Sequence, residues 1–145
     1  MIHDLAEFER SPASVEIEPE QLRTALFNPS PTVFAHVAED GGRLLGMAIW
    51  FRNFSTWTGR NGIYLEDLFV RPEGRATGIG RALVAELAAI ALRSGYARVD
   101  WSVLDWNQSA IGFYQSLGAV PMDEWTGYRL SGEALAALGS IDHQV

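Results

Sequence analysis

The chain has 145 residues, a formal charge of −7 at neutral pH and no cysteine. This length predicts a single domain over residues 1–145, and the lack of cysteine excludes disulfide bonds, zinc–thiolate sites and thiol nucleophiles. The acidic balance argues against a nucleic-acid partner, because nucleic-acid phosphates are met by many Lys and Arg side chains. A cationic small molecule is compatible with this charge.

The charges are unevenly distributed, and every basic residue is an arginine. Residues 1–50 carry three arginines against eight acids, 123–145 carry one against four, and 51–122 carry seven against six. An anion would therefore meet least repulsion in the middle of the chain. No window has the apolar length of a membrane span and the chain starts without a basic leader, so we expect a cytoplasmic protein with no membrane partner.

The first half of the chain contains two helical patterns followed by strands. Apolar residues recur twice at helical spacing, and an Asn-Pro-Ser-Pro segment ends the second pattern. The turn Asp40-Gly41-Gly42 between two apolar segments predicts a β-hairpin. In chain order we expect helices over 1–10 and 18–27, strands over 32–38 and 44–51, a loop over 53–62 and a strand over 63–70.

The second half alternates helices with shorter strands. A glycine-rich segment leads into an apolar-faced helix that Ser94-Gly95 terminates. One strand–loop–helix–strand unit over 63–104 places the chain in the α/β or α+β class. In chain order we expect a helix over 81–93, a strand over 97–104, a helix over 107–117, a strand over 125–130 and a short helix over 133–138.

The segment from Arg75 to Gly80 has the features of a phosphate site. Gly78 and Gly80 let backbone N–H groups converge on one anion, at the N-terminus of the following helix. Arg71, Arg75 and Arg81 add positive charge there. A P-loop is excluded because its lysine is absent, and the glycine spacing does not match the Rossmann fingerprint.

Two segments resemble the signatures of the GNAT acetyltransferase superfamily. LEDLFVRPEGRATGIGRALV (65–84) is similar to its acetyl-CoA-binding motif, and WNQSAIGFYQSLGA (106–119) to its second signature. LAEFE (5–9), Trp57 with Gly59 and YLEDLFV (64–70) resemble the diamine, spermidine/spermine and thialysine acetyltransferase branch. The resemblance covers nearly the whole chain and implies a mixed, mostly antiparallel twisted sheet flanked by helices.

The chain departs from the superfamily pattern at two places. Members begin with a strand and turn before the first helix, whereas this sequence starts within that helix. Either the true start lies upstream or the first strand is absent, which would leave the next strand with an open edge. Ala76 stands where members usually have glycine. Alanine is tolerated there unless the position requires a positive φ.

The resemblance implies transfer of an acetyl group from acetyl-CoA, the only expected cofactor, directly to an amine. The strand residues would bind the pantetheine arm through their main chain, with one N–H polarising the thioester carbonyl, and the loop would bind the phosphates. The implied cofactor-binding residues are Leu68, Phe69, Val70, Arg75, Ala76, Thr77, Gly78, Ile79, Gly80, Arg81, Asn107, Ser109, Ala110 and Tyr114.

Two residues carry the implied catalytic roles. An alkyl amine is almost fully protonated at neutral pH, so a carboxylate must accept its proton, and Glu66 matches the family position. A regular strand would direct its neighbour Asp67 to the opposite face, so only one of the pair should meet a given site. Tyr114 is the matched general acid for the leaving thiolate.

The amine would be bound by Glu9, Trp57, Glu66 and Asp67, since carboxylates and an indole face suit an alkylammonium chain. The histidines His3, His36 and His143 have no ligand spacing, so no metal is expected. Relatives commonly form homodimers that share the active site, which makes a homodimer the expected assembly. The alternatives are another amine (an amino acid, an aminoglycoside or a protein amine) or a CoA-binding module with little catalysis.

Overall fold

The computed structural model describes residues 1–140, and the chain divides into two compact units. The first unit is Met1–Asn107, and the second begins at Gln108. His143 lies outside the described residues. The elements of the first unit are α1 (Ile2–Phe8), α2 (Pro19–Phe27), β1 (Val33–Asp40), β2 (Arg43–Ser55), β3 (Arg60–Val70), α3 (Ile79–Arg93) and β4 (Val99–Asp100), with short 3-10 turns at Pro12–Ser14 and Pro72–Gly74.

The sheet contains four strands in the order β1-β2-β3-β4. The first three strands pair antiparallel, and β4 pairs parallel with β3. Gly41 and Gly42 form the β1–β2 turn with φ values of +56° and +80°, which glycine adopts without strain. The mixed sheet confirms the expected fold class, and β1 forms one edge of the described sheet.

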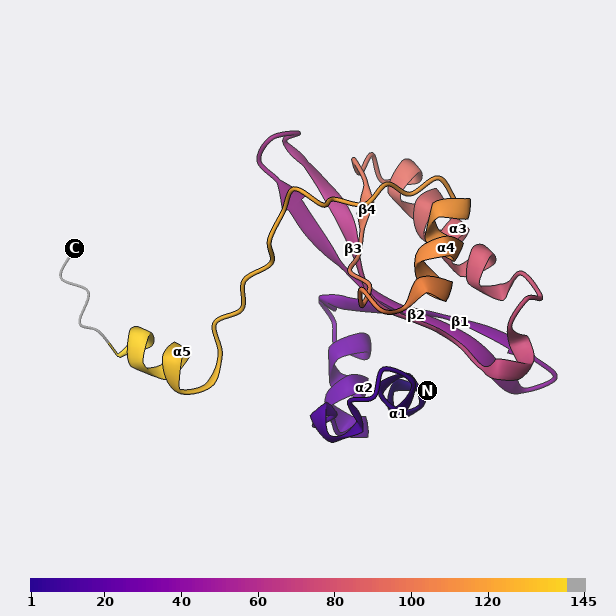
Figure 1. The fold of residues 1–145 in the computed structure, drawn as a ribbon, viewed down its shortest axis with the longest axis horizontal. Coiled ribbons are helices and arrows are strands. Elements are labelled where there is room, and N and C mark those ends of the chain that lie inside the picture. The colour runs from indigo at the N-terminus through magenta and orange to yellow at the C-terminus, as the bar shows by residue number, and fades with distance from the viewer. Residues whose placement is uncertain (141–145) are drawn as a thin grey trace. The chain divides into compact units, whose positions relative to one another are not determined.

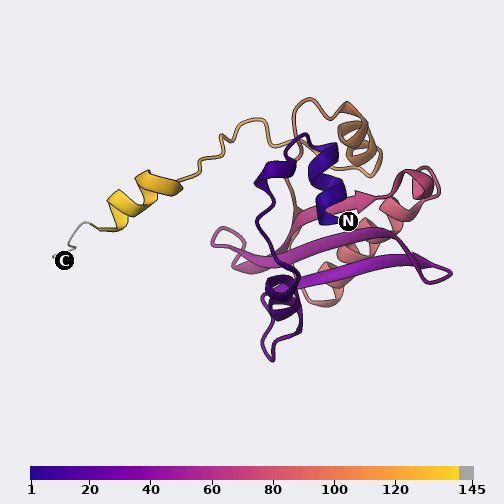
Figure 2. The same cartoon turned by 90° about the horizontal axis from the view of Figure 1, so that it is seen from below.

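Helices cover both faces of the sheet, α1 and α2 on one and α3 on the other (Figures 1 and 2). Alternation along β2 divides the core, because Ala48 and Trp50 face α3 while Met47 and Ile49 face α1. The α3 side buries Leu83 and Leu87 from the helix against Ile63 and Leu65 of β3, and the α1 side buries Phe69 with Ile2 and Leu5 packed against it.

A β-bulge interrupts the pairing of β2 with β3. Ile49 pairs with Asp67, but the next β2 residue, Trp50, pairs with Leu65, so Glu66 is an extra residue on β3. The bulge changes the alternation: Leu65 faces α3, Asp67 lies opposite Ile49 on the α1 face, and Leu68 faces α3 again. Strand β3 therefore has two halves that are out of phase.

The β2–β3 hairpin is longer than expected, and the prediction of a loop over 53–62 is wrong. Both strands continue into this segment, with Asn53 paired to Gly62 and Ser55 to Arg60, so that only 56–59 form the turn. Exposed aromatic and arginine residues there weakened the strand pattern, although backbone pairing alone sustains a hairpin arm. The expected strand over 97–104 is hydrogen-bonded to β3 as a strand only at Val99–Asp100.

The second unit contains α4 (Gln108–Ser116) and α5 (Gly132–Gly139), which confirms both helices expected there. The predicted strand over 125–130 is absent, and that prediction is wrong. A strand requires hydrogen bonds to a neighbouring strand, and these residues belong to no sheet in the described chain. Their side chains are exposed, Trp125 by 66% and Tyr128 by 96%.

Candidate active site

Three carboxylates gather where α1 meets β3. The bulge places Asp67 on the α1 face, and Glu66, the extra residue beside it, is exposed at the same point. Glu9 follows the last residue of α1, which packs on this face through Leu5. The expectation that Glu66 and Asp67 lie on opposite faces assumed a regular strand, and the bulge removes that premise.

The electrostatics of this cluster centre on Asp67. Burial, which is the largest cause, and the negative charges of Glu66 and Glu9 together raise the pKa of Asp67 to about 6. A carboxyl group with this pKa is largely ionised at neutral pH but still binds a proton readily. The cluster can therefore attract an ammonium group and accept a proton from it.

The loop before α3 has the backbone geometry expected of an anion site. Gly78 is the N-cap residue with φ +92°, no side chain caps the helix, and the first backbone bond of α3 is donated by Ala82 to the Gly78 carbonyl. The N–H groups of Ile79, Gly80 and Arg81 at this helix N-terminus are thus suited to phosphate oxygens. Thr77 steadies the loop by donating its hydroxyl to the Gly74 carbonyl at 2.7 Å.

Ala76 has φ +60°, one of two non-glycine residues with a positive φ in the described chain. The position therefore requires the left-handed conformation in which glycine, usual there in the superfamily, is unstrained. The departure from the family pattern at Ala76 thus carries an energetic cost, which the sequence alone left open.

The three arginines of this segment have different surroundings. Arg71 pairs with Asp4 at 3.4 Å and donates to the Leu44 carbonyl. Arg75 donates to the Val70 carbonyl at 3.0 Å, with its guanidinium 5.1 Å from the ring centre of Phe8. Arg81 is exposed in the first turn of α3. Arg81 is therefore the arginine best placed for a phosphate at the helix N-terminus.

Strands β3 and β4 separate toward their C-terminal ends, since they pair only at Ile63 with Val99 and Tyr64 with Asp100. Among the described residues, Leu68–Val70 pairs with β2 and not with β4, and the Val70 carbonyl accepts a bond from Arg75. These main-chain groups fit the extended amide-bearing arm that the resemblance implies.

The remaining cofactor candidates follow β4. Asn107 ends the first unit, and its N–H donates to the Leu104 carbonyl at 2.8 Å. Ser109, Ala110 and Tyr114 belong to α4 in the second unit. Within α4 the rings of Tyr114 and Phe113 lie 5.2 Å apart.

Trp57 lies away from the carboxylates of its own chain. It occupies the β2–β3 turn with 86% of its surface exposed. Along β3 the distance from Arg60 to Asp67 is roughly 20 Å at about 3.3 Å per residue. The structure thus brings Glu9, Glu66 and Asp67 together, whereas Trp57 lies in the turn at the far end of the β2–β3 hairpin.

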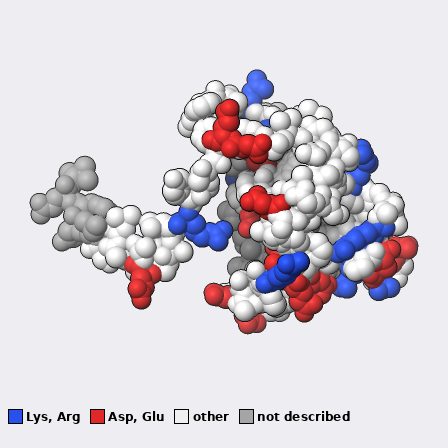
Figure 3. Space-filling model, viewed as in Figure 1, with Lys and Arg blue, Asp and Glu red and all other residues white. Residues whose placement is uncertain are grey.

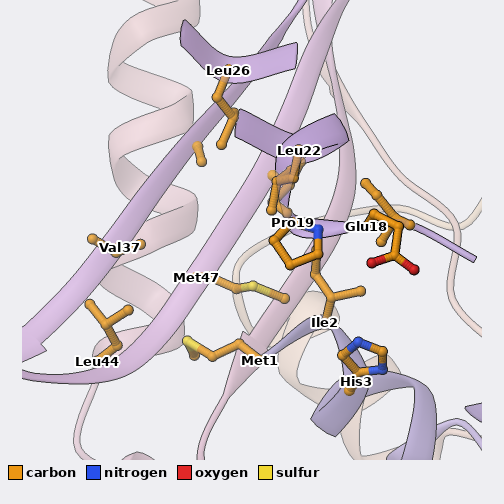
Figure 4. Close-up of a pocket in the computed structure, with 13 residues that line it drawn as sticks. Met1, Ile2, His3, Glu18, Pro19, Leu22, Leu26, Val37, Leu44 and Met47 are labelled. Atoms are coloured by element: carbon orange, nitrogen blue, oxygen red, sulfur yellow. The ribbon is translucent and has the colours of Figure 1, made fainter. Parts of the chain in front are cut away.

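An apolar pocket of about 350 Å³ opens between α1, α2 and the β1–β2 hairpin (Figure 4). Side chains such as Ile2, Leu22, Val37 and Met47 line it, with His3 and Glu18 as its polar members. None of the residues predicted for the cofactor or the amine lines this pocket.

The charges around the site are mixed, and in Figure 3 acidic and basic side chains form small groups of both signs. Within residues 1–140, no three His, Asp or Glu side chains are grouped so as to hold a metal ion. No helix in the same range has the length and apolar character to span a membrane.

A sequence profile described as the acetyltransferase (GNAT) family matches residues 1–119. The chain belongs to this family. A thialysine N-epsilon-acetyltransferase from Sus scrofa is 39% identical over 95% of this chain and 87% of its own length. A thialysine N-epsilon-acetyltransferase from Caenorhabditis elegans is 37% identical over 93% of this chain and 84% of its own length. An L-ornithine N5-acetyltransferase from Arabidopsis thaliana is 38% identical over 67% of this chain and 42% of its own length.

Solved structures share the fold. An integron cassette protein from the mobile metagenome of V. cholerae has a TM-score of 0.80 at 28% identity, covering 97% of this chain and 88% of its own. An aminoglycoside acetyltransferase from a soil metagenomic sample has a TM-score of 0.75 at 16% identity, covering 88% and 83%. These matches confirm the GNAT fold, and the chain is an N-acetyltransferase of a family that uses acetyl-CoA.

Two features of the site were not predicted from the sequence. One is the bulge. The apolar residues Ile63, Leu65 and Leu68 are spaced first by two positions and then by three, and this change of spacing indicates the extra residue. The other is a stack of aromatic rings and guanidinium groups at the end of α1, in which Arg10 lies over Trp106. No local pattern indicates this stack, because its members come from four separate segments.

Proposed function

We propose that this enzyme transfers the acetyl group of acetyl-CoA to a primary amine of a small cationic substrate, such as a polyamine, a diamine or a thialysine-like lysine analogue. The observation that supports it is the position of Asp67, held on the α1 face beside Glu66 and Glu9 with its pKa raised to about 6. The names of the relatives, two of which specify amines of amino acids, point to the same class.

The three carboxylates perform two tasks in this reaction. Their negative charge draws the ammonium group to the α1 face of β3. Asp67, with Glu66 beside it, then accepts a proton from the ammonium, directly or through water, because its pKa suits a general base near neutral pH. Glu9 keeps the cluster anionic after that proton has been taken.

Acetyl-CoA supplies a thioester, whose C–S bond breaks as the amine nitrogen forms the C–N bond, so that an amide and a free thiol result. The main chain of Leu68–Val70 holds the donor's arm along the open edge of β3 and donates an N–H to its carbonyl oxygen. Tyr114 gives the departing sulfur its proton, and the second proton that the nitrogen loses on becoming an amide restores the phenol. No cysteine is available for an acetylated intermediate, so transfer is direct.

The phosphates of acetyl-CoA are held by the N–H groups that open α3, with Arg81 beside them. Asn107, Ser109 and Ala110 are proposed as further cofactor-binding residues because they match the second signature of the superfamily. We further propose a cytoplasmic homodimer in which residues 1–145 act as one catalytic domain. The exposed side chains of Phe54 and Trp57 on the β2–β3 hairpin support a partner surface.

The test is release of free thiol from acetyl-CoA in the presence of a panel of polyamines, diamines, lysine analogues, aminoglycosides and a peptide amine. Thiol release with diamines or lysine analogues at the highest kcat/KM supports the proposal. A preference for the aminoglycoside or the peptide contradicts the substrate class. Stabilisation by CoA without thiol release for any amine contradicts catalysis and indicates a CoA-binding module.

A further inference from the structure

Five side chains form a continuous stack beside the carboxylates. The guanidinium of Arg75 lies 6.0 Å from the ring centre of Phe69 and 5.1 Å from that of Phe8. Phe8 in turn lies 6.1 Å from Trp106, and the guanidinium of Arg10 lies 4.8 Å from the Trp106 ring centre. Phe69 is on the same face of β3 as Asp67, so the stack leads from the carboxylates to Arg10.

Arg10 is held in a strained backbone conformation. Its φ is +61°, and it shares a positive φ with Ala76 alone among the non-glycine residues described. The N–H of Ser11 donates to the Ala6 carbonyl and that of Arg10 to the Glu7 carbonyl, which is the helix ending that usually takes glycine at this position. An arginine here costs stability, and such strain is typical of functional positions.

The guanidinium of Arg10 is available to a ligand. Five arginines of the described chain form ion pairs with Asp or Glu, whereas Arg10 forms none among residues 1–140. The guanidinium carbon lies 4.8 Å from the centre of the Trp106 ring, and the Arg10 side chain is exposed. An arginine in this position is suited to a carboxylate, which it can bind through two parallel bonds.

Consecutive residues at the end of α1 thus carry opposite charges with different surroundings. The negative charge of Glu9 contributes to the raised pKa of Asp67, whereas the guanidinium of Arg10 contacts the Trp106 ring. A polyamine, which is cationic along its whole length, would be repelled by Arg10. A diamino acid has one ammonium for the carboxylates and one carboxylate for the arginine.

We propose that Arg10 binds the carboxylate of a diamino-acid substrate whose side-chain amine is acetylated beside Asp67. This inference rests on the proposed function and narrows its substrate class from cationic amines in general to amino acids with a second amine. Arg10 is then a substrate-binding residue that determines specificity, and Trp106 and Phe8 fix its orientation.

The experiment compares ornithine with 1,4-diaminobutane, which is ornithine without its carboxylate, by thiol release at saturating acetyl-CoA. We expect the wild-type enzyme to prefer ornithine, and Arg10→Gly to lower the ornithine-to-diamine ratio of kcat/KM about 10- to 100-fold, the effect of one charge-assisted pair. Arg10→Lys keeps the charge and restores part of the ratio. Arg23→Gln, which removes an equal charge from the exposed face of α2, leaves the ratio unchanged.

Thermal unfolding separates this role from a structural one. Glycine relieves the strain at position 10, so Arg10→Gly is expected to melt at or above the wild-type temperature while its substrate ratio falls. An equal loss of kcat/KM for both substrates, or a wild-type enzyme indifferent to the carboxylate, overturns the role of Arg10 and leaves the acetyltransferase proposal standing. Thiol release with neither substrate overturns the role of Arg10, whereas the acetyltransferase proposal fails only when no amine of the panel releases thiol.

Discussion

The carboxyl group of Asp67 is half-buried beside two other acids, which is unfavourable for its ionised form. A residue whose only role was to stabilise the fold would have a cation as its neighbour, yet no arginine pairs with it among the described ion pairs. The arrangement therefore lowers the stability of the fold, and in the proposed mechanism it provides a proton acceptor near neutral pH.

The pH dependence of the reaction tests this residue. Asp67 must be ionised to accept a proton, so kcat/KM should fall as the pH drops through about 6. Asp67→Asn should lower kcat/KM about 100-fold or more and remove this acid limb. Glu66→Gln removes a neighbouring negative charge and should therefore move the limb to lower pH.

The matched control is Glu7→Gln, which neutralises an exposed carboxylate of α1 that is not among the causes of the Asp67 shift. It should keep the wild-type profile. An acid limb that persists unchanged in Asp67→Asn would assign the titration to another group.

The strain at Ala76 predicts a stabilising substitution. Ala76→Gly should raise the free energy of unfolding by up to about 1 kcal/mol, because glycine adopts φ +60° without steric cost. Ala85→Gly, at an exposed site inside α3, should lower it by about 1 kcal/mol. Urea unfolding of both variants measures these values, and equal destabilisation by the two glycines would refute strain at Ala76.

At the scale of elements, strand β3 joins the two halves of the site. Its first half is paired with β4 and packs Ile63 and Leu65 against α3, and its second half leaves β4 and carries the carboxylates and the expected donor site. The bulge lies at the junction of these halves. The inserted residue is Glu66 itself, and its insertion also places Asp67 on the α1 face.

Deletion of Glu66 tests the bulge. The shortened strand keeps Leu65 opposite Trp50 and Asp67 opposite Ile49, so the hairpin becomes regular and no core residue changes face. We expect a cooperatively folded protein by circular dichroism with strongly reduced kcat/KM. Glu66→Gly, which keeps the bulge but removes the carboxylate, should retain more activity than the deletion. Equal activity of the two variants would show that only the carboxylate of Glu66, and not the bulge in the backbone, matters for activity.

The sequence predicted most elements because hydrophobic period and turn residues act locally. The hairpin at Gly41–Gly42, helix α3 and the loop before it were all visible in this way. Strand pairing is non-local, which is why the arm at Asn53 was missed and the strand at Trp125 was wrongly expected. Among the site residues, Glu9 and Asp67 were identified, but their common face depended on a bulge that the regular-strand assumption hid.

At the scale of the whole molecule, the position of Trp57 is informative. The hairpin holds it roughly 20 Å from Asp67 along the strand, at about 3.3 Å per residue, so it does not serve the carboxylates of its own chain. In the proposed homodimer it would serve those of the partner. Size-exclusion chromatography with light scattering measures the assembly directly.

Mixing two variants tests whether the site is shared. Asp67→Asn and Trp57→Ala should each be impaired as pure proteins, whereas an equal mixture refolded together should recover about a quarter of wild-type activity, since half of the dimers would contain one intact site. A mixture no more active than the mean of the two pure variants would exclude sharing. Glu7→Gln refolded together with Asp67→Asn is the control for the mixing procedure, because Glu7→Gln keeps the proposed site intact.

The bulge at Glu66 also leaves a signature that needs no substrate. A residue outside the hydrogen-bond ladder has an amide that exchanges with solvent without any opening of the sheet. Its neighbours Leu65 and Asp67 are paired with the long central strand β2 and should exchange slowly. Amide exchange would therefore show one fast position within the most protected strand of the enzyme, and the ligand-induced slowing of that single amide would report when the amine site is filled.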